Sequence, residues 1–334
     1  MDLCVIEGDG VGHEVIPAAL KVLQVVMPEV VVHTAEAGFE TLKASGTPLP
    51  QATIDLALKC KAVLFGAADS PSYPVDGYFS PIIKLRQLLK TYGNLRPARY
   101  IPVTTATPGL DLVVVRENTE DLYVVNETTH ADGDSSTAQK VVTRAATEKI
   151  SHMAFKLARK QERSQVTVVH KANILPQSDG LFRRVALEVA EDYPDIEVDE
   201  LLVDTAAYWM VKNPTQFDVI LTSNLYGDIL SDMAAAWGGG LGIAPALNLG
   251  DGVAIAEPVH GSAPDIMGKG IANPTAAILS VVMLLNHHWN RPDLGGRIYD
   301  AVHRTFDAGD HTVDIYSEGA ISTEAFVERV IANL

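Results

Sequence analysis

Residues 3–28 read LCVIEGDGVGHEVIPAALKVLQVVMP, and this stretch decides the class of fold. It begins with a short apolar run, Leu3–Ile6, that is typical of a buried strand. After a glycine-rich turn, apolar side chains recur at helical spacing until Pro28, namely Val15, Ala18, Ala19, Val22 and Val26. A buried strand that leads through a tight turn into an amphipathic helix predicts an α/β fold.

The same alternation continues along the chain. Further strand-like runs are Ala62–Phe65, Leu112–Val115, Val166–Val169 and Val219–Leu221. Helical patterns cover about 13–27, 51–60, 145–160, 179–191, 228–237 and 274–288. Alternating strands and helices predict a largely parallel sheet with right-handed crossovers. A length of 334 residues suggests two domains.

The overall charge and composition limit the classes of partner. Lys and Arg number 26 against 42 Asp and Glu, a formal net charge of −16. A surface this acidic argues against nucleic acid or an anionic membrane, although local arginines can still bind a small anion. The longest apolar stretch, Ala276–Leu285, is too short for a bilayer, and no signal peptide is visible. Two cysteines, Cys4 and Cys60, do not make a disulfide framework, which favours a reducing, cytoplasmic location. Both are expected to be small core residues.

An acidic pair lies in the segment TSNLYGDILSDMAAAW, residues 222–237. A short strand should run into a turn here, and a helix should begin near Asp228. Asp228 and Asp232 are four residues apart, so their carboxylates share one helical face about 5–6 Å apart at Cβ. They could complement the helix dipole, or they could bind Mg²⁺ or Mn²⁺. Asp204, which ends the run ELLVD, could supply a third carboxylate.

Basic and hydroxyl side chains near the apolar runs could act on an acidic substrate. Arg86 and Arg96 lie in IIKLRQLLKTYGNLRPAR, and Arg116 directly follows an apolar strand. A guanidinium group can bind a carboxylate through two hydrogen bonds. Tyr123 follows Arg116 by seven residues, and Lys171 follows the run QVTVVH. Each residue alone has an ordinary structural explanation, but three arginines beside a metal would suit a di- or tricarboxylate.

Glycine-rich and polar segments leave several alternatives open. The turn EGDGVGHE is not G-x-G-x-x-G, which disfavours the usual Rossmann dinucleotide site. The segment EPVHGSAPDIMGKGIANP, residues 257–274, could bind a pyrophosphate through backbone N–H groups or be an ordinary loop. The polar stretch Asn126–Thr137 is either a surface loop or an arm toward another subunit. The stretch Trp237–Gly242 is either a hinge or a close backbone approach.

Seven segments in order carry a resemblance that covers nearly the whole chain: GDGVGHE, NLRP, VVRENTEDLY, HKANIL, VDTAAY, TSNLYGDILSD and EPVHGSAPDIMGKGIANPTAAILS. The chain resembles the metal-dependent β-hydroxyacid oxidative decarboxylases, which are the isocitrate, 3-isopropylmalate and homoisocitrate dehydrogenases. The resemblance implies a two-domain, non-Rossmann α/β fold and a homodimer, or a tetramer of dimers, with active sites shared between subunits. It implies a cofactor domain over 1–91 and 239–334, and a substrate, metal and dimerisation domain over 92–238.

The resemblance also implies roles for individual residues. Arg86, Arg96 and Arg116 would hold the carboxylates of the substrate, and Ser80, Ile83 and Asn173 would contact it as well. Tyr123 would be the general acid, and Lys171 of the neighbouring subunit would be the general base or assist it. Asp204 of that subunit, with Asp228 and Asp232, would ligate Mg²⁺ or Mn²⁺. The implied cofactor contacts are Asn173, His260, Gly261, Ser262, Ala263, Pro264, Asp265, Ile266 and Asn273.

The substrate is expected to be read by SPSYPVDGYFSPIIKLR, residues 70–86. This segment is similar to that of homoisocitrate dehydrogenases, which favours homoisocitrate. Some bacterial homoisocitrate enzymes that also accept isocitrate carry an arginine where Ile83 stands, so isocitrate should be a poor substrate. By charge alone, Ile82 and Ile83 would also suit the isopropyl group of 3-isopropylmalate, and a malate- or tartrate-type acid is a further alternative.

The cofactor is expected to be NAD⁺, and the chain is expected to be catalytic. Asp265, the residue after HGSAP, would accept hydrogen bonds from the ribose hydroxyls and repel a 2′-phosphate; capping of the next turn is the alternative. A non-catalytic regulatory subunit would have lost a metal aspartate, the tyrosine or the lysine, and all are present. Glycine is usual where Asp121 stands, and Ser-Gly is common at Ala246–Leu247; we expect neither change to affect catalysis.

Overall fold

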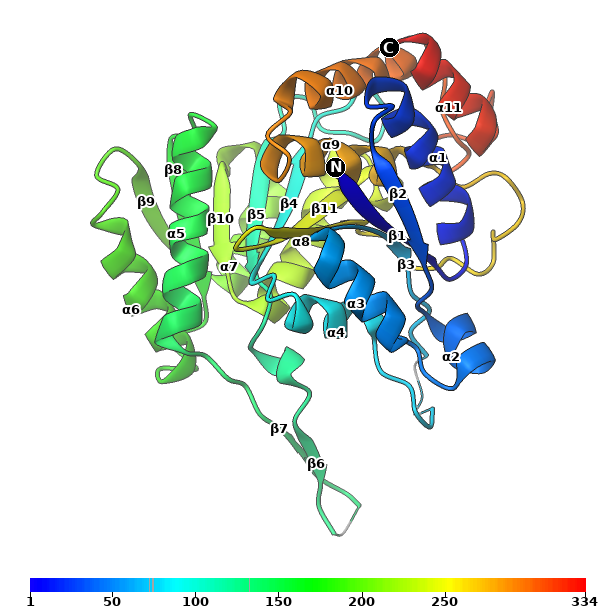
Figure 1. Cartoon of the computed structure of the whole chain (residues 1–334). Helices are drawn as coiled ribbons and strands as arrows, with labels where there is room; N and C mark the ends of the chain where they lie inside the picture. The colour runs from blue at the N-terminus through cyan, green and yellow to red at the C-terminus, as the bar shows by residue number, and fades with distance from the viewer. Residues whose placement is uncertain (72, 74, 132) are drawn as a thin grey trace. The chain divides into compact units, whose positions relative to one another are not determined.

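The N-terminal stretch folds as the sequence predicts, into strand β1 (Asp2–Gly8) followed by helix α1 (Gly12–Val26) (Figure 1). The structure is a computed structural model and describes residues 1–71, 73, 75–131 and 133–334. Ser72 and Pro74 of the substrate-reading segment and Asp132 of the polar stretch lie outside the described residues. Val15, Ala19 and Val22 are on the buried face of α1.

The chain divides into two units, each formed from separate stretches of sequence. Unit 1 consists of Met1–Thr91, Tyr100–Pro108 and Ala235–Leu334. Unit 2 consists of Tyr92–Arg99 and Gly109–Ala234. This division assigns residues 100–108 and 235–238 to unit 1, where the expected boundaries placed them in the second part. The binding functions expected of the two parts stay predictions.

Unit 1 contains a five-stranded arrangement in the order β2-β1-β3-β12-β11. Neighbouring strands are parallel except for the β11–β12 hairpin. The other strands are β2 (Val31–Ala35), β3 (Ala62–Ala67), β11 (Pro245–Gly250) and β12 (Val253–Pro258). The remaining helices are α2 (Phe39–Ser45), α3 (Gln51–Cys60), α4 (Pro81–Leu88), η3 (Leu241–Ile243), α9 (Thr275–His287), α10 (Pro292–Asp307) and α11 (Thr323–Ala332).

Unit 2 has strand order β4-β5-β10-β8-β9, parallel from β5 onward, with β4 antiparallel to β5. The strands are β4 (Gly93–Arg99), β5 (Asp111–Glu117), β8 (Gln165–His170), β9 (Glu197–Leu202) and β10 (Val219–Thr222). The helices are η1 (Leu122–Val124), α5 (Arg144–Lys160), α6 (Ser178–Ala190), α7 (Val203–Lys212), η2 (Pro214–Gln216) and α8 (Asn224–Gly238), whose last turn belongs to unit 1. The mixed, mostly parallel arrangement confirms the predicted fold class.

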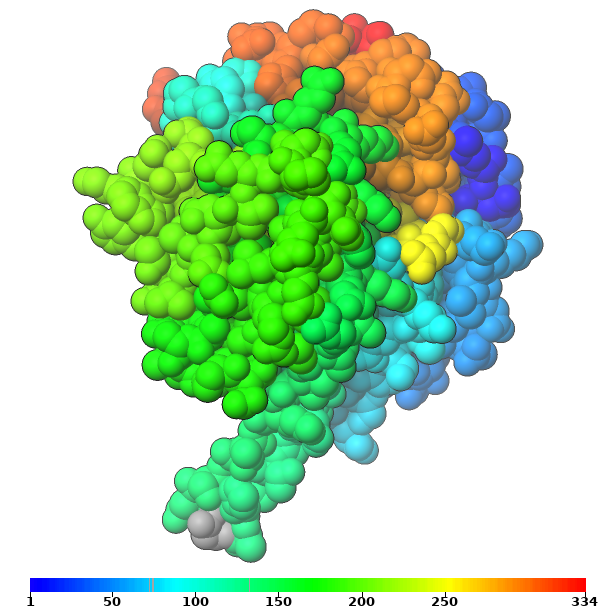
Figure 2. Space-filling view, turned by 90° about the vertical axis from the view of Figure 1, so that its left-hand side faces the viewer, coloured from blue at the N-terminus to red at the C-terminus, as the bar shows by residue number. Residues whose placement is uncertain are grey.

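The polar stretch at 126–137 contains two short antiparallel strands, β6 (Glu127–Thr129) and β7 (Ser136–Ala138). Both strands are exposed along their length. The hairpin extends away from helices α5 and α6 of the same unit, as Figures 1 and 2 show. An extended hairpin without a buried face favours the arm over the plain surface loop.

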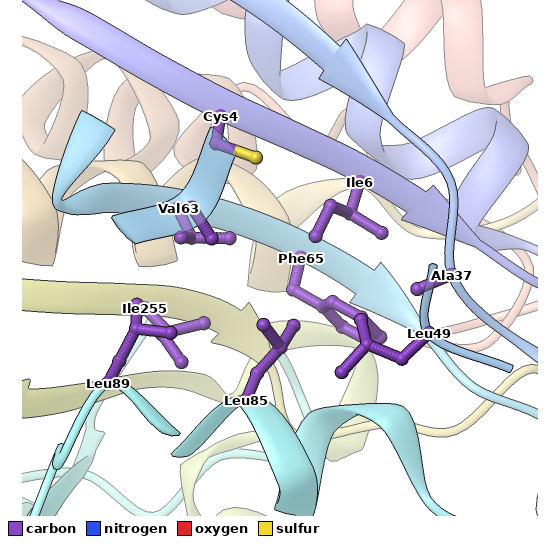
Figure 3. Packing of buried hydrophobic residues seen from close by; sticks show 10 residues of the cluster. Cys4, Ile6, Ala37, Leu49, Val63, Phe65, Leu85, Leu89 and Ile255 are labelled. Atoms are coloured by element: carbon purple, nitrogen blue, oxygen red, sulfur yellow. The ribbon is translucent and has the colours of Figure 1, made fainter. Parts of the chain in front are cut away.

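A buried apolar cluster in unit 1 fixes the helix that carries Arg86 (Figure 3). Leu85 and Leu89 at the end of α4 pack with strand residues, and Ile82 is partly buried against the same cluster. The cluster consists of Cys4, Ile6, Ala37, Leu49, Ala57, Val63, Phe65, Leu85, Leu89 and Ile255. Spacings of three and four residues place Ile82, Leu85 and Leu89 on one face, while the Arg86 guanidinium donates to Glu257, which is not part of this cluster.

Both cysteines are free thiols at this core, as expected. Cys4 is fully buried, and burial raises the pKa of its thiol to about 12. Among the helices that the structure describes, none combines the length and apolar character needed to cross a membrane.

Candidate active site

The predicted catalytic residues of unit 2 follow the carboxyl ends of three adjacent parallel strands. Thr222 at the end of β10 is in register with Arg116 of β5 on one side and with Val169 of β8 on the other. Arg116, the start of α8 and Lys171 therefore leave the same edge of the sheet. Ligands of open α/β sheets bind at this edge.

Helix α8 begins at Asn224, four residues earlier than the sequence predicted. Asp121, far away in sequence, accepts hydrogen bonds on Oδ2 from the Ser223 hydroxyl and the Leu225 N–H, both at 2.9 Å. This carboxylate satisfies donors at the start of the helix, which no local pattern could reveal. Asp228 consequently lies in the second turn, so complementing the helix dipole is a weaker explanation for it.

Two predicted arginines surround the acidic pair of α8. Arg116 is 1% exposed and donates to Asp228, and its Nε and Nη2 donate to Asn224 Oδ1 at 2.9 and 2.7 Å. Arg96 Nη1 lies 3.1 Å from Asp228 Oδ1 and 3.4 Å from Asp232 Oδ1. Unit 2 thus gathers cationic groups for an acidic substrate and carboxylates for a cation.

Gly227 explains how α8 can lie so close to Arg116. A Cβ at this glycine would stand 2.6 Å from Arg116 Cγ and 2.7 Å from Arg116 Cβ. Any larger residue would displace the arginine, so the glycine of the NLYGD segment is a packing requirement of the site.

Tyr123 completes this group. Its hydroxyl donates to Asp228 Oδ2, and the Arg116 guanidinium lies 4.9 Å from the centre of its ring. Burial raises the pKa of Tyr123, and the hydrogen bond to Asp228 adds to this while Arg116 opposes it. The phenol therefore stays protonated at neutral pH, as a general acid must.

Lys171 and Asp204 form a separate pair in unit 2. The Lys171 ammonium group donates to Asp204, and this hydrogen bond lowers the pKa of the Asp204 carboxyl. The two residues that the resemblance assigns to the neighbouring subunit thus lie together.

The donor set of α8 fits a hard divalent cation. Asp228 and Asp232 offer carboxylate oxygens from one helix face, and the Asp232 side chain is 54% exposed. Burial raises the pKa of Asp232, and nearby Asp228 raises it further, while Arg96 and Arg116 lower it. Across residues 1–71, 73, 75–131 and 133–334, no three His, Cys, Asp or Glu side chains lie together as a metal site. Asp204 therefore does not join Asp228 and Asp232 within one chain.

In unit 1, Arg86 is held by residues that the sequence did not single out. Its guanidinium donates to buried Glu257, and Glu257 also accepts from Asn248 Nδ2 at 2.6 Å. Arg86 Nε is buried without a hydrogen-bond partner in the described part of the chain, so one donor of this guanidinium stays unsatisfied there. Ser80 and Ile83, both partly exposed, belong to the same unit.

The glycine-rich turn after β1 packs against the segment expected to bind the cofactor. Val11 N–H donates to Ser262 O at 2.8 Å. Gly10 has φ +58°, and a Cβ there would stand 2.1 Å from the same oxygen. The close approach requires glycine, so this turn supports the 257–274 loop of the same unit.

Two side chains of that loop retain binding capacity. His260 Nε2 is buried without a partner among the described residues, and burial lowers the pKa of this histidine. The exposed Asp265 carboxylate makes no hydrogen bond or ion pair within the part of the chain that is described, which disfavours turn capping. A histidine nitrogen and a carboxylate without partners are groups that could bind the polar edges and ribose hydroxyls of a dinucleotide.

The other predicted cofactor contacts lie at different places. Asn273 is buried and bonds Asp314 Oδ2 at 3.0 Å, and Asn173 is exposed in unit 2 beyond Lys171. Gly242 lies beside Asn273, and a Cβ at this glycine would stand 2.4 Å from Asp314 Oδ2. This favours a close backbone approach at Gly242 over a hinge.

Several residues of the site escaped prediction although they lie inside quoted segments. Glu257 begins the EPVHGSAPD segment, and Asn224 and Ser231 lie within SNLYGDILSD. Ser231 Oγ accepts from Arg96 Nη1 at 2.8 Å, and Asn224 accepts from Arg116. Their position inside those segments was the only sign of a role in the sequence. Which arginine each of them binds becomes visible only in the fold.

Comparisons with known proteins identify the family of the chain. Residues 2–330 match the family model described as isocitrate/isopropylmalate dehydrogenase. The isocitrate/homoisocitrate dehydrogenase of Thermus thermophilus is 48% identical over 332 residues, covering 99% of this chain and 98% of that protein. The 3-isopropylmalate dehydrogenase of Archaeoglobus fulgidus is 44% identical over 333 residues, covering 99% of each chain.

A solved structure shows the same fold. The crystal structure of isocitrate dehydrogenase from Methylococcus capsulatus superposes with a TM-score of 0.96 at 41% identity, covering 99% of this chain and 98% of that one. The family consists of β-hydroxyacid dehydrogenases and decarboxylases that act on small hydroxy acids and typically use NAD(P) and a divalent metal. The chain is an enzyme of the isocitrate/isopropylmalate dehydrogenase family.

Proposed function

We propose that this enzyme catalyses the NAD⁺-dependent oxidative decarboxylation of homoisocitrate to 2-oxoadipate, with Mg²⁺ or Mn²⁺, in cytoplasmic lysine biosynthesis. The proposed reaction rests mainly on one observation: Arg96, Arg116 and Tyr123 all contact Asp228 in unit 2. The choice of homoisocitrate rests on the segment before Arg86, with Ile83 in place of an arginine. The 48% identity to a relative named isocitrate/homoisocitrate dehydrogenase supports it.

In this proposal, each group has one task. Arg86, Arg96 and Arg116 bind the substrate's carboxylates, because guanidinium groups pair with them bidentately. Lys171, once its ammonium group has lost a proton to solvent, accepts the proton of the substrate hydroxyl. Tyr123 donates its phenolic proton to the carbon from which CO₂ has left. Burial, which raises the pKa of Tyr123, keeps that proton available at neutral pH.

The proposal assigns residues to the divalent cation and to NAD⁺. Asp228 and Asp232, with Asp204 of a second subunit, would hold the divalent cation, which when bound polarises the hydroxyl and stabilises developing negative charge. Asn173, Asn273 and the loop 260–266 would hold NAD⁺, which when bound accepts the hydride.

The separation of the carboxylates supports a homodimer with shared sites. Asp204 does not meet the α8 pair among the side chains that the structure describes, so a three-carboxylate site needs a second copy. Unit 2 also carries large exposed apolar side chains that an interface would bury, namely Val125, Ile174, Tyr208, Val211 and Ile229.

We predict that homoisocitrate gives the highest kcat/KM and that Ile83→Arg improves the use of isocitrate. The added guanidinium can pair with the carboxylate of the shorter acid, and such a pair is worth on the order of 1.5–3 kcal/mol, or about tenfold to a hundredfold in kcat/KM. Steady-state kinetics with homoisocitrate, isocitrate and 3-isopropylmalate measure it. Ile83→Met, similar in size and uncharged, is the control and should leave isocitrate use unchanged.

A higher kcat/KM for 3-isopropylmalate would assign the enzyme to leucine biosynthesis instead. That second candidate has its own support in the apolar side chain of Ile83 and in the Archaeoglobus relative. A dominant activity on isocitrate would reject both homoisocitrate and 3-isopropylmalate as the substrate indicated by residues 70–86. Absence of activity on all three acids would favour a regulatory subunit of the same fold.

We predict that kcat/KM is at least about a hundredfold higher with NAD⁺ than with NADP⁺. The Asp265 carboxylate has no partner within the described chain and would meet the 2′-phosphate with like charge. Losing the hydrogen bonds to the ribose hydroxyls and adding this repulsion each cost on the order of 1–3 kcal/mol, and more where a charged group is left unpaired. A total of about 2.8 kcal/mol already corresponds to a hundredfold, since each 1.4 kcal/mol is about tenfold. Kinetics with each cofactor at saturating hydroxy acid measure the ratio.

Asp265→Asn should lower that preference, because it removes the charge while keeping the size of the side chain. Asp251→Asn, in the β11–β12 turn of the same unit, is the matched control and should leave the ratio unchanged. Equal use of NADP⁺ by the unaltered enzyme would show that Asp265 does not face the ribose.

A further inference from the structure

A partly buried lysine of unit 2, Lys140, lies between the carboxylates of two buried aspartates. Its ammonium nitrogen lies 2.5 Å from Asp179 Oδ1 and 3.5 Å from Asp121 Oδ1, and the side chain is 14% exposed. Both aspartates are 2% exposed. The ammonium also lies 4.5 Å from the centre of the Tyr226 ring, so one cation compensates two buried carboxylates.

Asp121 connects this cation to the tyrosine and to the metal-binding helix. Its Oδ1 accepts the N–H of Leu122 at 3.0 Å, at the start of the turn η1 that carries Tyr123. Its Oδ2 accepts the Leu225 N–H in the first turn of α8, which carries Asp228. Asp121 has φ +69°, a backbone conformation that favours glycine, so side-chain contacts must hold it there.

Asp179 connects the same cation to the proposed base. Its Oδ2 accepts the backbone N–H of Lys171 at 2.7 Å, and its Oδ1 faces Lys140 as an ion pair without an aligned hydrogen bond. Lys140 therefore joins, through one aspartate each, the segment of Tyr123 and the segment of Lys171.

We propose that Lys140 is a positioning residue, which holds Tyr123, Lys171 and the start of α8 through Asp121 and Asp179 without touching substrate. Without the ammonium group, the negative charges of Asp121 and Asp179 lose their shared cation, and the two carboxylates move toward water. Each movement loosens the backbone N–H that the carboxylate holds. The kinetic part of this proposal rests on the proposed function, and the backbone part does not.

The first test is amide hydrogen exchange of the free enzyme carrying Lys140→Met. We expect exchange at the amides of Leu122, Lys171 and Leu225 to rise by about tenfold or more, since each donates to one of the two aspartates. Unchanged exchange at these three amides would overturn the proposal whatever the enzyme's substrate is.

The second test is kinetic. Lys140→Met should lower kcat by about tenfold to a hundredfold with a much smaller change in KM, because small displacements of reacting groups have effects of that order. Lys140→Arg, which keeps the charge, should recover part of kcat. A kcat within threefold of the unaltered enzyme would overturn the proposal.

A matched control separates positioning from loss of stability. Arg163, 6% exposed in the same unit, bridges Asp111 at 2.5 Å and Asp218 at 2.6 Å at the opposite ends of the strands. Arg163→Met should lower the Tm as Lys140→Met does but leave kcat and the three amides unchanged. Equal losses of kcat in both variants would show that Lys140 acts only through stability.

If Lys140→Met does not fold, Asp179→Asn replaces it, because asparagine keeps the size of the side chain but removes the charge that pairs with Lys140 and strengthens the bond to the Lys171 N–H. It should raise exchange at Lys171 and lower kcat in the same range. Wild-type exchange and kcat in this variant would overturn the proposal.

Discussion

Asp228→Asn should lower kcat by at least about a hundredfold while the chain stays folded. The Asp228 carboxylate is where Arg96, Arg116 and Tyr123 meet. Loss of residues that only support a metal ligand changes affinity or activity by about 10–100-fold, so loss of a proposed ligand should cost at least the upper figure. Steady-state kinetics and calorimetric titration with Mn²⁺ measure the two effects.

Asp218→Asn is the control, because Asp218 is also the partner of a buried arginine. Its Oδ1 lies 2.6 Å from Arg163 Nη1, at the end of the strands away from the site. Both substitutions should lower the Tm, and only Asp228→Asn should lower kcat and weaken Mn²⁺ binding. Full activity of the unaltered enzyme in excess chelator would contradict the metal role.

Tyr123→Phe and Lys171→Met should each lower kcat by about 10²–10⁴-fold, the usual contribution of a positioned acid or base. Lys171→Met should disturb folding little, since its partner Asp204 is 63% exposed. If sites are shared, a dimer of one chain of each variant keeps one intact site. A one-to-one mixture that exchanges subunits should then recover about a quarter of the wild-type activity.

Heterodimers purified through two different affinity tags make this test quantitative, with about half of the wild-type activity expected. Each homodimer, treated identically, is the control and should stay inactive. Heterodimers that form but show no recovery would mean that Tyr123 and Lys171 act in the same chain. That outcome would leave the family membership intact and reject the shared site.

The sequence predicted the fold class and supplied the candidate site residues because its local signals are strong there. Buried strands such as Leu112–Val115 are continuous apolar runs, and the strand found, Asp111–Glu117, contains that run. In long segments such as TSNLYGDILSD, the spacing of the carboxylates on a helix already indicates a possible cation site. The roles of these residues stay predictions until the experiments above are done.

What the sequence could not predict depends on contacts between distant residues. The early start of α8 depends on Asp121, about a hundred positions away along the chain, and the partner of Arg86 is Glu257. We expected Asp121 to be irrelevant to catalysis, yet it bonds the turn of Tyr123. The strands of the hairpin β6–β7 were not predicted, because strands exposed on both faces show no alternation of apolar and polar residues.

Helix α4 separates the residue proposed to choose the substrate from the residues that hold the helix in place. Leu85, Leu89 and, in part, Ile82 pack into the core, while Ile83 lies outside that cluster and is partly exposed. Evolution can therefore exchange position 83 at little cost to folding, as is usual for substitutions outside a core. An ancestor with broad acid specificity could have diverged into enzymes of different pathways through single substitutions there, with no compensating change in the interior.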